Sequence, residues 1–362
     1  MSTAENGNGN GHAGNGVSRT PRTAWVGGAT GFLGSYVVQA LEARGDEVVP
    51  VSRTGGGGRA RAVDVLDPDA VRESARGCEL AFLCTGKVTR DRDESEELYR
   101  LHVQGTKSAL AGLRAAGVRR VVVASTSGTL AVGTDRNRIA DEGCRAPLEV
   151  IASWPYYRTK LYAEREALEA NAPPAFEVVV VNPSLLLGPG DVRESSTGDL
   201  RRFLEGIIPA TPAGGLAFVD VRDAADGMLL AAERGRAGER YILNAQNLTV
   251  EAFFQRLERI SGVRAPLFKL PASRPVALGI GRLFSKAVRA IGGQPPVSEE
   301  SLEMGQYFWY CDSSKAEREL GFRPRDPGET LRDTIDDLVA RKVVFPRSAQ
   351  RQGAPKKSFL RL

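Results

Sequence analysis

The chain of 362 residues is poor in the side chains that build disulfide frameworks and metal centres. It contains four cysteines, none in a CxxC or other metal-binding spacing, and two histidines, His12 and His102. We therefore expect no metal site, and unpaired cysteines are typical of the reducing cytoplasm. No apolar run reaches the ~18 residues of a membrane-spanning helix, and residues 1–16 contain no hydrophobic stretch like that of a secretory signal. These absences favour a cytoplasmic protein.

Acidic residues are missing from the C-terminal end, which accounts for the net charge of +5. After Phe345 the chain carries five basic and no acidic residues. Positive charge confined to one end predicts a solvated tail and no nucleic-acid surface on the folded body. We expect disordered tails at residues 1–22, which are rich in glycine and asparagine, and at residues 346–362.

From Thr23 onward, short β-branched runs alternate with amphipathic stretches. This alternation predicts an α/β fold, a Rossmann-type doubly wound parallel sheet covered by helices on both faces. We expect an NAD(P)-binding domain at residues 23–185 that also receives segments from about 216–245, and a smaller α/β substrate domain at 186–345. Pro50 predicts an irregularity in the second strand. The predicted strands are 23–27, 47–52, 60–65, 80–84, 120–125 and 177–182, and the predicted helices of this part are 31–43, 67–75, 95–116 and 156–171.

A glycine-rich segment follows the first predicted strand and opens a helix. Gly28 allows a tight turn, Gly31 the close approach of a pyrophosphate, and Gly34 the packing of helix on strand. The helix N-terminus offers unpaired N–H groups to the phosphates. The spacing GxxGxxG differs from the standard GxGxxG, but its context predicts a dinucleotide site. Its residues are Gly28, Thr30, Gly31, Phe32, Leu33 and Gly34.

The residue after the second strand indicates which dinucleotide binds. An acidic side chain there would hydrogen-bond the ribose of NAD, whereas this chain has Arg53. A guanidinium stacks on adenine and pairs with a 2′-phosphate, so we predict NADP, with NAD as the alternative. Asp64 and Val65, at the end of the third strand, are expected to receive the adenine edge.

Tyr156 and Lys160 stand four residues apart in a predicted helix, and therefore on one face. An ammonium one turn away favours the phenolate and lowers the pKa of a tyrosine from its usual ~10. Tyr156 would protonate a carbonyl oxygen as hydride arrives, or deprotonate an alcohol in the reverse direction. Lys160 would also hold the nicotinamide ribose. Thr126, in the hydroxyl cluster after the fifth strand, would orient the substrate oxygen.

These segments, with Asn182-Pro183-Ser184 and Asp312-Ser313-Ser314-Lys315, resemble motifs of the extended short-chain dehydrogenase/reductases, the NAD(P)-dependent epimerase/dehydratases. The similarity runs from about Thr23 to Val344 and is greatest to the dihydroflavonol 4-reductase-like branch. It implies a Rossmann domain with NAD(P), and in many such proteins helices like 95–116 and 156–171 pair two subunits into a homodimer. The residues it implies are the triad Thr126, Tyr156 and Lys160, and cofactor contacts at Cys84, Thr85, Gly86, Pro183 and Ser184.

Two positions depart from the family pattern and leave alternatives open. His102 replaces the usual asparagine of Asn-Val-x-Gly-Thr. It either hydrogen-bonds the backbone near the site or is a polar residue on a packed helix. Lys87 follows the fourth strand, where it either reaches the substrate or a cofactor phosphate, or is a solvated side chain.

The leading hypothesis is an NADP-dependent reductase that acts on a ketone of a small or medium-sized apolar metabolite. One alternative is a nucleotide-sugar epimerase or dehydratase with retained NAD(P), in which Arg193, Arg201 and Arg202 hold a diphosphate. The reductase is favoured because the expected pocket wall is apolar. The wall residues are Leu185, Leu186, Leu187, Phe203, Leu204, Ile207, Ile208 and Leu216.

Two further readings concern other classes of function. A catalytically silent NAD(P)-sensing scaffold is disfavoured because both Tyr156 and Lys160 are present. Residues 275–289 are apolar with spaced basic side chains, so this stretch either lies on a membrane surface or packs on the core. Packing on the core is the favoured expectation. The expected partners are a small-molecule substrate and a second subunit, with no membrane span and no nucleic acid.

Overall fold

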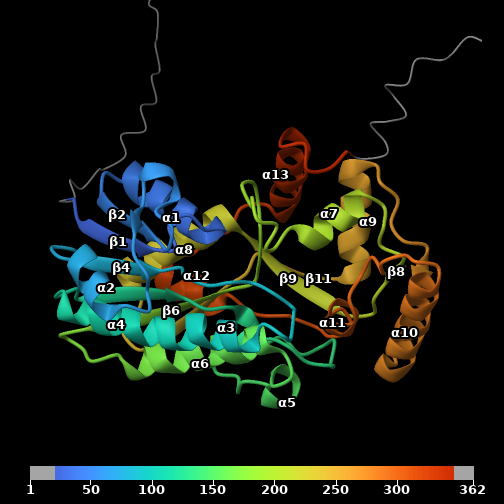
Figure 1. The fold of residues 1–362 in the computed structure, drawn as a ribbon, viewed down its shortest axis with the longest axis horizontal. Coiled ribbons are helices and arrows are strands. Elements are labelled where there is room, and N and C mark those ends of the chain that lie inside the picture. Colours follow the sequence, from blue (N-terminus) through green and yellow to red (C-terminus); the bar gives the residue numbers. More distant parts are fainter. Residues whose placement is uncertain (1–20, 346–362) are drawn as a thin grey trace, which may run out of the picture.

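The computed structural model describes residues 21–345, which form two lobes along the long axis of the molecule (Figure 1). The predicted tails therefore lie outside the described residues, except for Pro21 and Arg22. The larger lobe contains a seven-stranded parallel sheet with the order β10-β6-β5-β4-β1-β2-β3. This is the predicted Rossmann arrangement. Its strands are β1 (Thr23–Gly27), β2 (Glu47–Ser52), β3 (Arg61–Ala62), β4 (Leu80–Leu83), β5 (Arg120–Ala124), β6 (Glu177–Pro183) and β10 (Arg240–Leu243).

Helices cover both faces of this sheet, which explains why its strands are apolar on both sides. Val26, Phe82 and Val181 pack on one face with α1 and α8. Trp25 and Val180 pack on the other face with α2, α4 and α6. The helices of this lobe are α1 (Phe32–Ala43), α2 (Pro68–Ser74), α3 (Ser95–Tyr99), α4 (Gly105–Ala115), α5 (Leu148–Ile151), α6 (Pro155–Glu169), α8 (Val221–Arg234) and α12 (Ser314–Leu320).

Two predicted elements differ from the structure. The third strand, expected at 60–65, is short and pairs only with Val51 and Ser52 of β2. Pro50 therefore has no partner in β3, so its missing N–H removes no hydrogen bond there. On its other side β2 pairs with β1, without the expected irregularity. The predicted helix 95–116 is divided by a π-helical turn at Arg100–Gln104, which buries His102.

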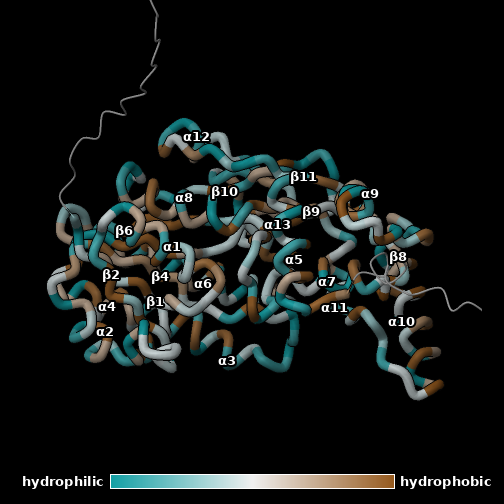
Figure 2. Tube along the Cα trace, turned by 90° about the horizontal axis from the view of Figure 1, so that it is seen from above, coloured by the Kyte–Doolittle hydropathy of each residue, from teal (hydrophilic) through white to brown (hydrophobic). Residues whose placement is uncertain are grey.

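The smaller lobe contains a three-stranded sheet, β11-β9-β7, and a two-stranded ladder, β12-β8. Phe203, Phe254 and Leu338 lie in its core, which α7, α9 and α13 enclose. Helix α10 projects from the end of this lobe in both views (Figures 1 and 2). Only Ala277 of α10 is buried, so the expectation that residues 275–289 pack on the core is wrong for most of the stretch. The elements are β7 (Leu185–Leu187), β8 (Ala210–Thr211), β9 (Gly215–Asp220), β11 (Gln246–Thr249), β12 (Phe268–Lys269), α7 (Gly198–Leu204), α9 (Val250–Ser261), α10 (Arg274–Ala290), α11 (Glu299–Met304) and α13 (Pro327–Ala340).

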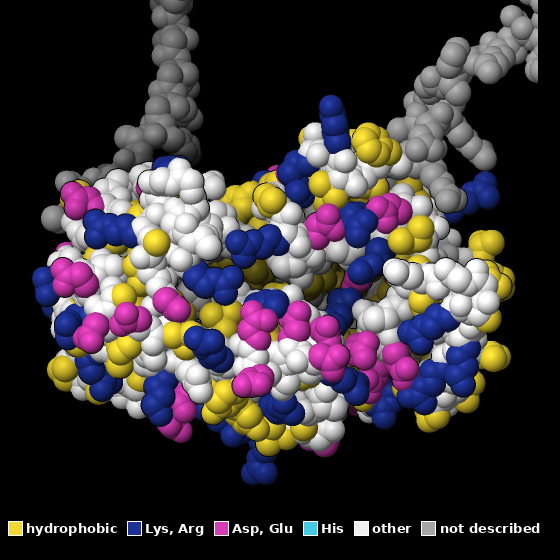
Figure 3. Space-filling view, in the orientation of Figure 1, with side chains coloured by type: hydrophobic (Ala, Val, Ile, Leu, Met, Phe, Trp, Pro, Cys, Tyr) yellow, Lys and Arg dark blue, Asp and Glu magenta, His cyan; other side chains and the backbone are white. Residues whose placement is uncertain are grey.

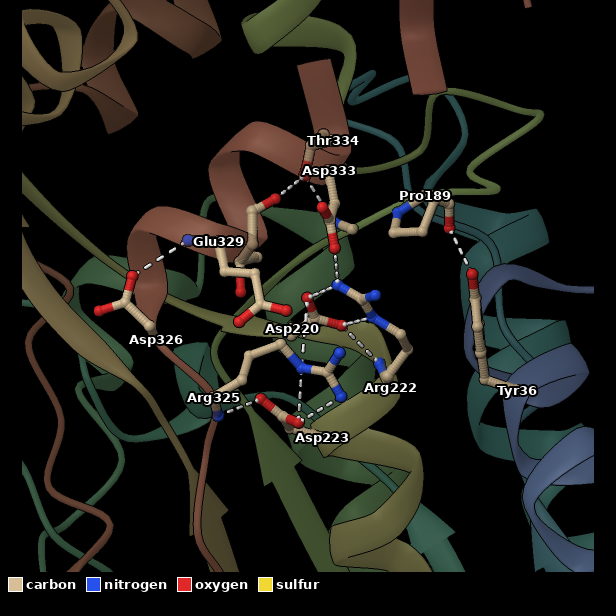
Figure 4. A network of polar contacts seen from close by, with 12 residues as sticks. Tyr36, Pro189, Asp220, Arg222, Asp223, Arg325, Asp326, Glu329, Asp333 and Thr334 are labelled. Atoms are coloured by element: carbon tan, nitrogen blue, oxygen red, sulfur yellow. Dashed lines mark hydrogen bonds and ion pairs between the residues drawn. The ribbon is translucent and has the colours of Figure 1, made fainter. Parts of the chain in front are cut away.

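A network of charged side chains joins the end of β9 and the start of α8 to α13 (Figure 4). Asp220, the last residue of β9, is buried and accepts hydrogen bonds from the Arg222 guanidinium at 2.8 and 2.7 Å. The same guanidinium pairs with Asp333 of α13 at 2.6 Å. Arg325, just before α13, pairs with Asp223 of α8 at 2.8 Å. The network therefore fixes a helix of the smaller lobe to a helix that covers the large sheet.

We predict that Asp220→Asn lowers the free energy of unfolding by about 2 kcal/mol at pH 7, because two guanidinium groups lose a buried anionic partner. Burial alone would raise the pKa of Asp220, but hydrogen bonds from Arg222 and the charge of Arg325 outweigh it and lower the pKa. The stabilisation is present above pH ~4 and is lost as the pH falls through the lowered folded pKa. Urea denaturation should show a difference from the wild type that narrows below pH ~4.

Asp69→Asn is the control for this experiment. Asp69 forms an exposed ion pair with Arg72, so the substitution should have little effect at any pH. A difference between Asp220→Asn and the wild type that stays constant down to strongly acidic pH would contradict the assignment.

Candidate active site

The turn between β1 and α1 forms a cradle of backbone groups. Gly28 has a φ of +74°, which favours glycine, and its carbonyl accepts a hydrogen bond from the Gly31 N–H at 2.9 Å. A Cβ atom at Gly34 would lie 2.2 Å from that carbonyl oxygen, and one at Gly28 would lie 2.7 Å from the Cys84 carbonyl oxygen. Helix α1 begins at Phe32 with no side-chain cap, so its first N–H groups are available to an anion. This geometry fits the pyrophosphate of a dinucleotide.

The other predicted cofactor residues follow neighbouring strands, and parallel strands bring their carboxyl ends to one edge of the sheet. Arg53 directly follows β2 and is exposed. Thr85 and Gly86 follow β4, and Pro183 ends β6. Ser184 is buried, and its hydroxyl donates to the Leu243 carbonyl at 3.2 Å or to the Asn244 side chain at 3.0 Å.

One of the two residues expected at the adenine is buried, and a third residue nearby was not marked by any motif. Asp64 is exposed, but Val65 is buried in the core, so only its backbone is available to an adenine. Ser52 is buried, and its Oγ has no hydrogen-bond partner among residues 21–345. A Cβ atom at Gly56 would lie 3.8 Å from that Oγ and 2.4 Å from the Thr30 methyl group. A hydroxyl of a bound nucleotide would satisfy Ser52, so the edge fits an adenine dinucleotide.

Helix α6 carries the predicted catalytic pair and one further acidic residue on the same face. The helix begins at Pro155, and Tyr156, Lys160 and Glu164 recur at intervals of four residues. Lys160 is buried, and its ammonium donates to the Ala124 carbonyl at the end of β5, at 2.6 Å. Burial lowers the pKa of Lys160 to about 8, and the negative charge of Glu164 opposes this shift.

The phenol of Tyr156 is not activated by Lys160 in this structure, contrary to the expectation from their spacing. Burial, with a smaller effect of Tyr157, raises the pKa of Tyr156 above its ordinary value. The Lys160 ammonium is directed to the Ala124 carbonyl instead. Tyr156 is therefore held as a neutral phenol, which is the protonation state of a proton donor.

Glu164 connects the helix to the strand ends that carry the rest of the site. Its Oε2 atom accepts hydrogen bonds from the Ser125 hydroxyl at 2.6 Å and the Asn182 amide at 2.8 Å. The same amide donates to the Thr126 carbonyl at 3.1 Å, and Arg240 of β10 pairs with Oε1 at 2.9 Å. The carboxylate thus fixes the loop after β5 against the catalytic helix. Its only signal in the sequence is the four-residue spacing from the lysine.

His102 hydrogen-bonds the backbone, one of the two roles that the sequence left open. Its Nε2 accepts a hydrogen bond from the Lys87 N–H at 3.1 Å, so Nδ1 carries the proton and donates to the Thr159 hydroxyl at 2.9 Å. Burial, followed by the charge of Lys160, lowers the pKa of His102 to about 3, and the imidazole is neutral. His102 therefore joins the loop after β4 to the catalytic helix.

The side chains of Lys87 and Cys84 have no reactive character. The Lys87 ammonium pairs with Glu94 at 3.0 Å and with Glu97 at 2.8 Å, in agreement with a solvated role. Burial raises the pKa of the Cys84 thiol to about 12, so the thiol is neutral. Lys87 contributes its backbone N–H, which donates to His102.

An aromatic cluster of Trp154, Tyr157 and Trp309, which no motif indicated, lies beside the loop after β5. The ring centroids of Tyr157 and Trp309 are 4.9 Å apart, and Trp309 stacks on Trp154 at 5.6 Å. A Cβ atom at Gly128 would lie 2.2 Å from the Tyr157 ring and 3.2 Å from the Trp309 ring, so both rings press on this loop. Figure 3 shows the molecule hollowed between its lobes, with hydrophobic atoms inside the hollow.

The apolar wall expected from leucine, isoleucine and phenylalanine side chains of residues 185–216 is only partly present. Leu187 and Leu204 are enclosed in the core of the smaller lobe, so the prediction that they line a pocket is wrong. Phe203 and Ile208 do line a cavity of about 260 Å³, which lies within the smaller lobe against residues 264–268. Leu185 and Ile207 remain exposed. Next to Tyr156, the aromatic cluster supplies apolar rings, with Tyr157 in direct contact.

Two kinds of feature are absent from residues 21–345. No group of three or more histidine, cysteine, aspartate or glutamate side chains is arranged to hold a metal ion. No helix in this part of the chain combines the length and apolar character needed to cross a bilayer. The four cysteines are free thiols.

Comparison with known proteins agrees with this geometry. The model of the NAD-dependent epimerase/dehydratase family matches residues 24–244, from the first strand of the large sheet to just beyond its last. The chain belongs to this family. The resemblance read from the motifs is thereby confirmed, and the chain is an NAD(P)-dependent enzyme with a Rossmann fold.

Two relatives and one solved structure are similar to this chain. A Synechocystis protein with the provisional name dihydroflavonol 4-reductase is 32% identical over 87% of this chain and 93% of its own length. The 4-hydroxy-2-methyl-3-oxo-4-farnesyl-3,4-dihydroquinoline-1-oxide ketoreductase of Stigmatella aurantiaca is 30% identical, over 83% of this chain and 92% of its own. A solved nucleoside-diphosphate-sugar epimerase of Pseudomonas aeruginosa has a TM-score of 0.71 at 22% identity, over 90% of this chain and 99% of that one. The last similarity shows the fold alone.

We predict that Glu164→Gln lowers the free energy of unfolding by about 2 kcal/mol, because Arg240 keeps its charge and loses its buried partner. The double variant Glu164→Gln/Arg240→Met should recover most of this loss, since both charges are then removed. Chemical denaturation measures both effects.

Glu166→Gln is the matched control on the same helix. Its partly exposed carboxylate lies 3.6 Å from Lys107, and the loss of such a pair changes stability by about 1 kcal/mol at most. Equal unfolding free energies for Glu164→Gln and Glu166→Gln would show that the buried carboxylate does not hold the site together.

Proposed function

We propose that this member of the epimerase/dehydratase family is an NADP-dependent reductase. It would reduce a ketone of a small or medium-sized apolar metabolite, or oxidise the matching secondary alcohol. The observation that carries the proposal is the position of Tyr156. Its ring centroid lies 4.9 Å from that of Tyr157, which belongs to the aromatic cluster. A neutral phenol beside apolar rings suits protonation of a carbonyl group on an apolar molecule.

In the proposed reaction, Tyr156 and the side chains around it each have a separate role. NADPH, when bound, supplies the hydride that adds to the carbonyl carbon. The Tyr156 hydroxyl donates its proton to the carbonyl oxygen, so the ketone gains one hydride and one proton and leaves as an alcohol. Thr126, partly exposed at the end of β5, orients that oxygen. With a pKa of about 8, Lys160 is mostly charged at neutral pH, and its proposed role is to hold the nicotinamide ribose.

The relatives support reduction over epimerisation. The Stigmatella aurantiaca protein is named for the reduction of a ketone on a farnesylated ring, an apolar molecule. A nucleotide-sugar epimerase or dehydratase would need cations for a diphosphate. Arg201 already pairs with Glu194 and Glu205, and Arg202 pairs with Asp199, which leaves Arg193 of the three expected cations. The sugar-modifying activity is therefore the second candidate.

The choice of NADP rests on Arg53, the first residue after β2, where no carboxylate stands to bind a ribose diol. Arg53→Ala should weaken NADPH binding about tenfold and leave NADH binding nearly unchanged, because only NADPH carries the 2′-phosphate. Tryptophan-fluorescence titration measures both dissociation constants. Arg76→Ala, at an exposed ion pair with Glu73, is the control. Equal weakening of NADPH and NADH would argue for a general role of Arg53 and against the preference for NADP.

Tyr156→Phe should lower the rate of ketone reduction by about 10²–10⁴-fold, because the proton donor is removed while the ring is kept. Binding of NADPH should change little. The assay follows consumption of NADPH with a panel of aryl and alkyl ketones, and Tyr162→Phe on the same helix is the control. A variant as active as the wild type would overturn the role of Tyr156, whereas turnover of nucleotide sugars alone would favour the second candidate.

We also propose a cytoplasmic location, which the four free thiols support. The proposed division of the chain has two units. The nucleotide-binding unit consists of residues 23–185 together with β9, α8 and β10, and the substrate unit consists of most of residues 186–345. Pairing of two subunits through residues 95–116 and 156–171 stays a prediction.

A further inference from the structure

Helix α10 exposes an apolar stripe that no other segment of residues 21–345 covers. Val276, Ile280, Leu283 and Phe284 are 52, 47, 70 and 43% exposed. Their spacing of three and four residues places them on one face of the helix, which Ile291 continues at 85% exposure. We name these five residues the α10 stripe. An exposed apolar surface of this kind marks an interaction site.

The side of α10 that packs on the protein lies beside the α10 stripe, because Ala277 and Gly281 each directly follow a residue of the stripe. Ala277 is buried there, and a Cβ atom at Gly281 would lie 2.0 Å from Leu302 of α11. The helix is thus held in place by one face, and Figure 2 shows that it stands away from the body of the smaller lobe. The exposed fractions of its residues show that the α10 stripe itself faces solvent.

Positive charge lies along one edge of the α10 stripe. Arg282, Lys286 and Arg289 follow each other at intervals of three and four residues, and α10 contains no acidic residue. Arg282 pairs with Glu299 of α11, whereas Lys286 and Arg289 form no ion pair within the described part of the chain. A second acidic residue of α11, Glu303, is paired with Arg92.

We propose that α10 docks the protein on a bilayer surface that contains anionic phospholipids. The α10 stripe would lie among the acyl chains at the interface, with Lys286 and Arg289 against the headgroups. Charge complementarity favours a lipid surface over a second copy of this chain, because a symmetric contact through the α10 stripe would bring two basic edges together. The sequence after Phe345 adds five basic and no acidic residues to the same chain. The inference rests on this surface alone and not on the proposed reductase activity.

Flotation of the full-length protein with vesicles tests the proposal. The vesicles are phosphatidylcholine alone, or phosphatidylcholine mixed with phosphatidylglycerol. The wild type should bind the mixed vesicles, and added salt should weaken the binding. Leu283→Glu and the double variant Lys286→Glu/Arg289→Glu should each reduce the partition coefficient about tenfold or more. Ile139→Glu, at a loop position that is 55% exposed, is the matched control and should bind as the wild type does.

Three results would overturn the proposal. The first is a wild type that does not float with the mixed vesicles. The second is full binding by Leu283→Glu, together with loss of binding when the five basic residues after Phe345 are replaced by glutamine, which would assign binding to the tail. The third is a wild-type dimer in sedimentation that Leu283→Glu dissociates, without vesicle binding, which would make the α10 stripe a contact between copies. NADPH titration of each variant confirms that the fold is intact.

Discussion

The buried carboxylate of Glu164 holds together the parts of the site that are distant in the chain. Burying a charge is costly unless donors and counter-charges surround it. Here Ser125, just after β5, Asn182 of β6 and Arg240 of β10 supply them. These are three adjacent strands of the large sheet. Helix α6 is thereby fixed to the strand ends that present Thr126 and Pro183, and the roles proposed for Thr126 and Tyr156 depend on this contact.

Burial also sets the charge states of the Tyr156 and Lys160 side chains. It raises the pKa of Tyr156 and lowers that of Lys160 to about 8, so a neutral phenol stands one turn before an ammonium that is close to losing its proton. The charge of Glu164 opposes the loss of the Lys160 proton. Tyr156 is therefore protonated in the protein without its cofactor. A positive charge brought beside its ring would lower its pKa.

The regular parts of the fold could be predicted because their signals are local. Strands β1 and β2 have the predicted bounds, since each is a β-branched run with a turn residue at its end. The cradle at Gly28 and the Tyr156–Lys160 spacing are local as well. The contact of Trp154 with Trp309 joins segments far apart in the chain, and the π-helical turn at 100–104 has no periodic signature. Likewise, the pattern of α10 predicted an apolar face but not what covers it, because burial depends on the whole fold.

Ultraviolet difference titration of tyrosine ionisation tests the central claim, that Tyr156 is a neutral phenol poised to be activated by the cofactor. The spectra of Tyr156→Phe are subtracted from those of the wild type, without and with saturating NADP⁺. The account predicts that the difference reports a phenol that ionises above the ordinary pKa of ~10 without nucleotide, and at a lower pH when the positive nicotinamide is bound. Ionisation at the same pH in both conditions would contradict it.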